Sequence, residues 1–214
     1  MNEALKRRVR LHLQYSWWKY LLALVISVMS ISMIFDMTEY RPPEDKKTDL
    51  YILTGPCDTE GLHSYLFPRL QERFPEQEEL TVITINLVNE DMYSRMQYST
   101  YVAARQGDVM LMPIAEVQNL LKQDEAGEIF DDLTPYIQEG LIDCSGMDLT
   151  LGEMKGPDGE KRIYGIPSAS LKGLEKYYIS PENTLLVSMS YGGNLKTAAG
   201  LIGLMVDEFR EKKE

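Results

Sequence analysis

The chain of 214 residues is 44% apolar and 26% charged, a balance typical of a folded globular domain rather than a disordered or fibrous chain. A net charge of −11 argues against nucleic acid as a partner, because phosphate binding requires a surplus of Lys and Arg. Two Cys and two His leave little material for a zinc site or a disulfide scaffold. We therefore expect no metal and no cofactor.

The N-terminal segment is basic and leads into a long apolar run. Residues 1–35 hold five basic residues and one acidic residue, so their net charge is +4 and that of the remaining 179 residues is −15. As a helix, residues 17–35 extend roughly 28 Å, close to a hydrocarbon core of about 30 Å. Trp17, Trp18 and Tyr20 stand where an interfacial aromatic belt lies, with the basic residues on their N-terminal side.

These features predict a single-pass protein of the plasma membrane. The positive-inside rule places residues 1–16 in the cytoplasm, residues 17–35 in the bilayer as an uncleaved signal anchor, and residues 48–214 outside the cell. Residues 36–47 form a tether, in which a Pro-Pro pair prevents the helix from continuing. A cleaved signal peptide is the alternative, although the best cleavage site, Ser30-Ile-Ser32, is followed by three bulky residues.

From Thr48 onward, strand and helix patterns alternate. They predict, in chain order, strand 49–53, helix 62–74, strand 80–87, helix 91–105, strand 108–112 and helix 114–121. Pro68 is expected to kink or divide the first of these helices, and Asn89 or Asp91 to cap the second. Such alternation predicts parallel strands joined by right-handed crossovers. The fold class is therefore α/β, with a mainly parallel sheet flanked by helices on both faces.

The rhythm changes in the last third of the chain. Residues 130–137 are typical of a short helical element, and the turn signal Gly156-Pro-Asp-Gly159 predicts a hairpin arm. Residues 183–190 form another strand candidate. The final helix, residues 198–209, carries one apolar stripe at helical spacing, so we expect it to pack on the sheet and close the domain.

Several of these segments resemble a known family. Residues 108–112 with the helix after them, residues 127–137 (GEIFDDLTPYI) and residues 158–167 (DGEKRIYGIP) resemble, in order and spacing, the first lobe of extracellular solute-binding proteins. Proteins of that family feed sugar-type ABC importers. The resemblance covers residues 48–167 and, more weakly, residues 181–209. It implies a single solute-binding-protein-like lobe that follows the N-terminal transmembrane helix.

The chain departs from this family where the second lobe is expected. In the family, the Gly-Ile-Pro segment leads into a second lobe, and hinge closure traps the ligand between the two lobes. Here only 16 residues, 168–183, separate Pro167 from the next strand, so no second lobe fits between them. One lobe presents half a site, and we expect a membrane protein partner or a homodimer to complete it.

A rule for open α/β sheets predicts the ligand edge, because ligands bind beyond the carboxyl ends of the strands. The candidates at this edge are Gly55, Asp58, Asn89, Glu90, Asp91 and Pro113. Acidic side chains there suit sugar hydroxyls or a cation, and a solvated helix start rich in acids is the alternative interpretation. Tyr191 is a further candidate, which would either stack on a sugar ring or pack on its own turn.

Catalytic motifs are missing from the sequence. It contains no Gly-x-Ser-x-Gly elbow, no His-Glu-x-x-His, no phosphate-binding loop and no Gly-x-Gly-x-x-Gly, so we predict that the chain is not an enzyme. His63 is expected to be a surface or packing residue. Cys57 and Cys144 are expected to be separate thiols, with a disulfide as the alternative that an exported location permits.

Two functions remain for a membrane-anchored lobe of this kind. The first is recognition of a carbohydrate or another small solute, as an accessory substrate-binding component of an ABC-type importer. The second is a non-transporting interaction or regulatory module, which scaffolds a membrane complex through a degenerate binding lobe. A small molecule that stabilises the domain would distinguish the first function from the second.

Overall fold

The computed structural model describes residues 3–87, 91–124 and 127–211, and the chain divides into two compact units, Met1–Arg41 and Pro42–Glu214. The first unit contains one helix, α1 (Glu3–Thr38). Its stretch Ser16–Thr38 is long and apolar enough to cross a membrane, a criterion that a signal sequence also meets. No residue in the apolar window of that stretch is buried by other described parts of the chain.

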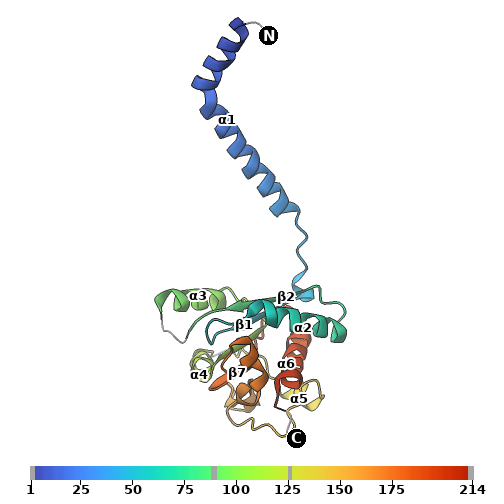
Figure 1. The fold of residues 1–214 in the computed structure, drawn as a ribbon. Coiled ribbons are helices and arrows are strands. Elements are labelled where there is room, and N and C mark those ends of the chain that lie inside the picture. Colours follow the sequence, from blue (N-terminus) through green and yellow to red (C-terminus); the bar gives the residue numbers. More distant parts are fainter. Residues whose placement is uncertain (1–2, 88–90, 125–126, 212–214) are drawn as a thin grey trace. The chain divides into compact units, whose positions relative to one another are not determined.

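The second unit is an α/β domain (Figure 1). Its elements are η1 (Glu44–Lys46), β1 (Lys47–Ile52), α2 (Thr59–Arg73), β2 (Glu79–Thr84), α3 (Met92–Ala103), β3 (Val109–Pro113), α4 (Ile114–Gln123), α5 (Thr134–Gln138), β4 (Glu153–Lys155), β5 (Lys161–Ile163), β6 (Gly165–Pro167), η2 (Ser168–Ser170), η3 (Lys172–Tyr177), β7 (Thr184–Ser188) and α6 (Leu195–Phe209).

The central sheet has the strand order β2-β1-β3-β7-β6. Strand β1 is parallel to both β2 and β3, which confirms the parallel arrangement predicted for the first three strands. Strand β7 is antiparallel to β3 and to β6, so the sheet is mixed. Because of this reversal, the carboxyl end of β7 lies beside the amino end of β3.

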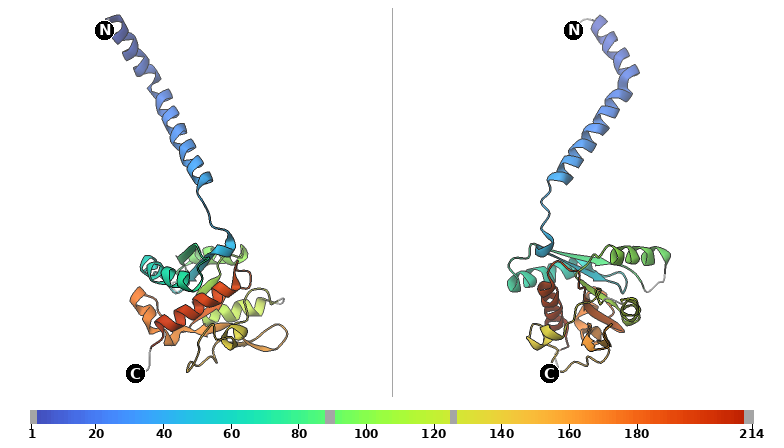
Figure 2. Two further views of the ribbon diagram at one scale, coloured as in Figure 1. Left: turned by 90° about the vertical axis from the view of Figure 1, so that its right-hand side faces the viewer. Right: turned by 180° about the vertical axis from the view of Figure 1, so that it is seen from behind.

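Alternating side chains along the strands fill two separate cores, one on each face of the sheet. Leu50 and Ile52 of β1 face the core that α2 and α6 cover, whereas Tyr51 and Leu53 face the core that α3 and α4 cover. Helices α2 and α6 lie side by side over their face (Figures 1 and 2). The prediction of an α/β sheet with helices on both faces is confirmed.

Helix α2 contains Pro68 and is not divided by it. Proline removes one backbone N–H and disfavours a helix interior, which is the reason a break was expected. The helix nevertheless buries Leu62, Leu66 and Leu70 completely on a single face against the sheet. Burial of each such side chain contributes about 1.5–3 kcal/mol, so the packing outweighs the lost hydrogen bond.

Helix α6 is more deeply buried than one apolar stripe predicts. Two glycines allow close contacts on sides of the helix that lie outside the apolar stripe. A Cβ atom on Gly200 would lie 2.2 Å from the ring of Phe74, and one on Gly203 would lie 2.3 Å from the Leu141 carbonyl oxygen. The helix therefore packs against the sheet, α2 and the segment after α5.

The last third of the domain contains the predicted hairpin and a short connection. Strands β4 and β5 pair antiparallel across the Gly156–Gly159 turn. Between β6 and β7, residues 168–183 contain the two 3₁₀ helices η2 and η3 and no second lobe. The buried Ser168 hydroxyl lies 2.9 and 3.0 Å from the carbonyl oxygens of Pro181 and Thr184, and its single proton is donated to one or shared between them, which fixes the return of the chain to β7.

Candidate functional site

At the carboxyl edge of β1, the predicted residues hold a turn and a helix start. Gly55 has a φ of +124°, which favours glycine, and its carbonyl accepts a hydrogen bond from the Thr84 hydroxyl. Asp58 is the N-cap of α2, and its carboxylate accepts a hydrogen bond from the Gly61 amide at 2.9 Å. Both groups therefore have a local structural role.

The other candidates at this edge follow β2 and β3. Asp91 is the N-cap of α3 and accepts a hydrogen bond from the Ser94 amide at 2.9 Å, as one of the two predicted caps. Hydrogen bonding from Ser94 lowers the pKa of Asp91 below its ordinary value. Pro113 ends β3 and directly precedes α4. Asn89 and Glu90 lie outside the described residues.

Tyr191 lies at the opposite edge of the sheet from these candidates. Because β7 is antiparallel to β3, Ser188 pairs with Val109 while Thr184 pairs with Pro113. The chain leaves β7 at the amino end of β3, where the Met189 amide donates to the Asp108 carbonyl at 2.9 Å. The structure therefore brings Gly55, Asp58, Asp91 and Pro113 to one edge and Tyr191 to the other.

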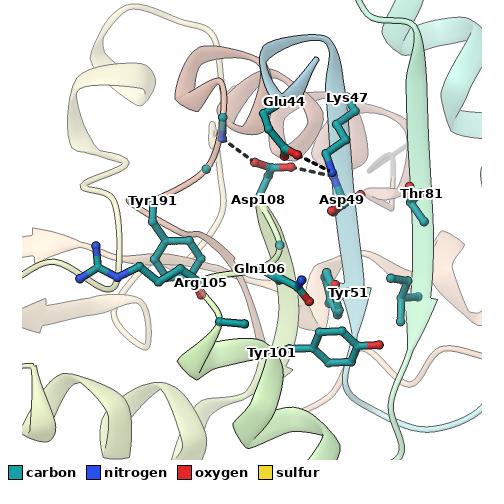
Figure 3. Close-up of a pocket in the computed structure, with 15 residues that line it drawn as sticks. Glu44, Lys47, Asp49, Tyr51, Thr81, Tyr101, Arg105, Gln106, Asp108 and Tyr191 are labelled. Carbon is teal, nitrogen blue, oxygen red and sulfur yellow. Dashed lines mark hydrogen bonds and ion pairs between the residues drawn. The ribbon is translucent and has the colours of Figure 1, made fainter. Parts of the chain in front are cut away.

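The edge that holds Tyr191 contains a cavity of about 550 Å³ (Figure 3). It extends along one face of β1 and β2 and reaches the start of β3. The residues that line it are Glu44, Lys47, Asp49, Tyr51, Thr81, Ile83, Tyr101, Ala104, Arg105, Gln106, Gly107, Asp108, Tyr191, Gly192 and Gly193. This cavity combines three tyrosines with charged groups of both signs, and it is partly open to solvent.

Strand alternation and helix length together produce the cavity. Lys47, Asp49 and Tyr51 project from one face of β1, and Thr81 and Ile83 stand beside them on β2 in register with Asp49 and Tyr51. This is the face that α3 and α4 cover. Helix α3 ends at Ala103, and the loop after it lines the cavity instead of covering the strand ends.

Asp108 joins the segments that surround the cavity. The side chain is 8% exposed, and its two carboxylate oxygens accept hydrogen bonds from the backbone amides of Asp49 at 2.7 Å and Gly193 at 3.0 Å. Burial raises the pKa of Asp108 even though both hydrogen bonds favour the ionised form. The residue therefore ties β1, the start of β3 and the loop after β7 together.

The two basic groups in the cavity are already paired. Lys47 Nζ lies 3.0 Å from Glu44 Oε1, and Arg105 contacts Glu128 Oε2 at 3.0 Å. Burial opposes the charge on Lys47, but the hydrogen bond that Lys47 donates to Glu44 and the negative charges of Asp49, Glu44 and Asp108 outweigh it and raise the Lys47 pKa. The potential in this part of the cavity therefore favours positive charge.

The aromatic residues form part of the floor and one wall. The rings of Tyr51 and Tyr101 meet edge to face, with centroids 5.1 Å apart. The hydroxyl of Tyr191 is buried and has no hydrogen-bond partner among the described residues. Burial raises the pKa of Tyr191 to about 12, so the hydroxyl keeps its proton and can donate it in a hydrogen bond.

The cysteines and His63 are placed in or beside packed regions. Cys57 and Cys144 are free, half-buried thiols, and both pack against the core under α2 and α6. Burial raises the pKa of Cys57, which outweighs a hydrogen bond with Thr84, and raises the pKa of Cys144 to about 11. A reactive cysteine needs a lowered pKa, so neither thiol is activated. His63 stacks on Phe67, with centroids 5.4 Å apart.

Sequence reasoning missed most of this cavity. Among the predicted candidates that the structure describes, Tyr191 lines it, and Gly55, Asp58, Asp91 and Pro113 do not. A partial signal was available in β1. One face of this strand carries the basic Lys47, the acidic Asp49 and the aromatic Tyr51, where a strand buried on both faces should be apolar. The contributions of Asp108 and Gly193 depend on the antiparallel path of β7, which no local pattern indicates.

Comparison with known proteins gives partial similarity to two solved structures. No protein-family model matches the sequence, and no curated protein matches it. An extracellular solute-binding protein family 1 from Alicyclobacillus acidocaldarius is 18% identical, with a TM-score of 0.39, over 61% of this chain and 29% of that one. A probable secreted solute-binding lipoprotein from Streptomyces coelicolor is 14% identical, with a TM-score of 0.35, over 60% of this chain and 30% of that one. The chain thus spans less than a third of the length of either protein.

Proposed function

We propose that this chain is a membrane-anchored, extracytoplasmic protein whose α/β domain binds a small polar solute in the cavity beside Tyr191. The role that this implies is an accessory substrate-binding component of an ABC-type importer. The N-terminus lies in the cytoplasm in this proposal, because the basic residues precede the apolar stretch of α1.

The cavity is the observation that carries the proposal. Its volume of about 550 Å³ falls within the range of about 300–1,000 Å³ typical of small-molecule sites. Such sites combine aromatic walls with a few polar groups that orient the ligand, as Tyr51, Tyr101 and Asp49 do here. Tyr191 also lines the cavity, and its hydroxyl is buried without a hydrogen-bond partner among the described residues.

A partner is expected to close the site. The cavity is partly open to solvent, and residues 168–183 supply no second lobe to cover a ligand. Binding by the single lobe should therefore be weak, and a membrane protein partner or a second copy of the chain would strengthen it by excluding water. This expectation agrees with the role of an accessory component rather than an independent receptor.

A thermal unfolding experiment tests solute recognition directly. The full chain in lipid nanodiscs is melted in the presence of carbohydrates, amino acids and organic amines, and unfolding is followed by circular dichroism. A ligand at a hundredfold excess over its Kd stabilises the native state by about 2.7 kcal/mol. Tyr191→Leu should abolish the shift and Glu153→Gln, in the β4–β5 hairpin and not among the lining residues, should retain it. A folded protein that responds to no solute class would contradict the proposal.

The exposed start of α3 favours a second candidate function, an interaction module in a membrane complex. Met92, Tyr93 and Met96 are 86%, 70% and 61% exposed, and they lie on adjoining turns of the helix. Large apolar side chains gathered on a surface mark contact sites more often than isolated ones do. If this face forms a homodimer, sedimentation velocity of the full chain should show a dimer that Tyr93→Glu converts to monomer, without any response to solutes.

A further inference from the structure

We infer that the cavity beside Tyr191 selects a small organic cation, such as a primary or quaternary ammonium compound. This inference rests on the proposed function, and it names the class of solute. It is carried by the combination of unpaired carboxylates, a helix C-terminus and tyrosine rings around one cavity.

The charged side chains that line the cavity are mostly acidic or already paired. Glu44, Asp49 and Asp108 line the cavity together with Lys47 and Arg105. Both basic groups are held in ion pairs, Lys47 with Glu44 and Arg105 with Glu128. Asp49 and Asp108 form no ion pair within residues 3–87, 91–124 and 127–211. Both oxygens of the buried Asp108 accept backbone hydrogen bonds, so Asp49 is the carboxylate that can contact a ligand directly, and Asp108 adds negative charge behind it.

The end of α3 adds negative potential to the same cavity. The carbonyl groups at a helix C-terminus carry a partial negative charge, which a basic residue in the last turn often compensates. The last turn of α3 has no basic residue, and Ala104, its C-cap, lines the cavity. Arg105 follows the C-cap, but its charge is paired with Glu128. This potential acts in the same direction as Asp49 and Asp108.

The tyrosines determine which kind of positive charge fits. The faces of aromatic rings attract cations within about 6 Å of the ring centroid, and the effect is used to recognise quaternary ammonium groups. Tyr51, Tyr101 and Tyr191 all line the cavity, and Figure 3 shows them below and beside the carboxylates. Tyr51 is buried, so Tyr101 and Tyr191, which are partly exposed, present the accessible ring surface. An ammonium group attached to an apolar body would contact both kinds of surface.

Other charged ligands fit this cavity less well. Among the described residues, no three His, Cys, Asp or Glu side chains form a group that could hold a metal ion. An anion would have to displace Glu44 or Glu128 from the basic groups and approach Asp49 and Asp108. A diffuse organic cation therefore meets the fewest electrostatic conflicts.

The test uses a pair of ligands with the same shape. Choline and its neutral isostere 3,3-dimethyl-1-butanol are titrated into the full chain in nanodiscs by calorimetry, together with putrescine and glucose. We expect saturable binding of choline or putrescine, at least tenfold tighter than that of the neutral alcohol. Asp49→Asn should weaken cation binding at least tenfold, while Glu153→Gln, which removes the same charge from a residue that does not line the cavity, should not.

A second variant tests the inference independently of Asp49→Asn. Thr81→Lys adds a positive charge beside Asp49, and it should abolish cation binding even if Asp49→Asn is too unstable to study. Equal affinity for choline and the neutral alcohol, or binding of glucose but of neither cation, would overturn the cation class and leave solute recognition standing. Binding of no solute at all would overturn both.

Discussion

The carboxylate of Asp108 accepts a hydrogen bond from the backbone amide of Gly193 at 3.0 Å, across 85 residues of sequence. Its second oxygen accepts from the Asp49 amide at 2.7 Å. These two bonds hold the loop after β7 against the amino ends of β1 and β3. The position of Tyr191, two residues before Gly193, depends on this arrangement.

Asp108→Asn should destabilise the domain. An amide has only one acceptor oxygen, so one of the two backbone N–H groups would face an NH₂ group and lose its partner. A buried donor left without a partner costs about 1–3 kcal/mol. Urea unfolding of the variant and the parent protein at neutral pH measures the loss, and an unchanged unfolding midpoint would contradict the structural role of Asp108.

The difference in unfolding free energy between the parent protein and Asp108→Asn should depend on pH. Burial raises the folded-state pKa of Asp108 above the ordinary value of 3.8, so its contribution to stability is fully present below pH 3.8 and is lost as the pH rises through the folded pKa. Asn has no such titration. The parent should therefore lose part of its advantage in unfolding free energy over the variant between pH 3.5 and pH 7. The other carboxyl groups titrate alike in both proteins, so their effects cancel in this difference. A difference that widened over this range would show that the folded pKa is lowered.

Gly193→Ala should displace η1 from its position beside the cavity. A Cβ atom at this position would lie 2.3 Å from the carbonyl oxygen of Glu44, so the backbone must move. Overpacking of this kind costs about 1–3 kcal/mol. Gly146→Ala is the control, because its Cβ would meet nothing within 4 Å, and the control reports the strain of its φ of +77° alone. Only Gly193→Ala should also weaken solute binding.

The helix caps at the carboxyl edge allow the two edges to be compared. Asp58→Ala removes the N-cap of α2 and should cost about 1 kcal/mol of unfolding free energy. Asp91→Ala removes the N-cap of α3. Because hydrogen bonding lowers the pKa of Asp91, the contribution of this cap to stability is present above pH 3.8 and is lost as the pH falls through the folded-state pKa. Both variants should bind solute as the parent does. Loss of binding would instead place the site at the carboxyl edge.

Thiol alkylation tests the environment of Cys144. Burial raises its pKa from 9.0 to about 11, so the thiolate fraction at pH 8 falls about a hundredfold relative to an unfolded chain. Native protein with Cys57→Ser, kept reduced, should react with iodoacetamide at least about tenfold more slowly than the same protein in urea, because the greater nucleophilicity of a less acidic thiolate offsets part of its lower fraction. Comparable rates in the two states would contradict the burial of this thiol.

The sequence predicts the elements of this fold better than their ends and connections. The strand near residues 49–53, the cap at Asp91 and the last helix are confirmed, because each depends on local periodicity or on a side chain next to its own backbone partner. Pro68 was expected to kink or divide α2, and the helix is undivided because burial of three leucines acts over a distance that local propensity ignores.

The candidate site was less accessible to sequence reasoning. The rule about carboxyl ends applies to parallel strands, and β7 is antiparallel, so Tyr191 comes to the other edge. The cavity also requires that α3 stop at Ala103, that Gly193 approach Glu44, and that Asp108 bind two distant amides. These conditions join segments far apart in the chain, and no spacing within one segment expresses them.

Hydrogen exchange of the full chain in nanodiscs, with and without a saturating solute from the thermal panel, tests the location of the site most directly. If the solute binds in the cavity beside Tyr191, exchange should slow in peptides that cover residues 44–51, 104–109 and 190–194. Protection confined to residues 54–61 and 111–116, at the carboxyl edge, would contradict it.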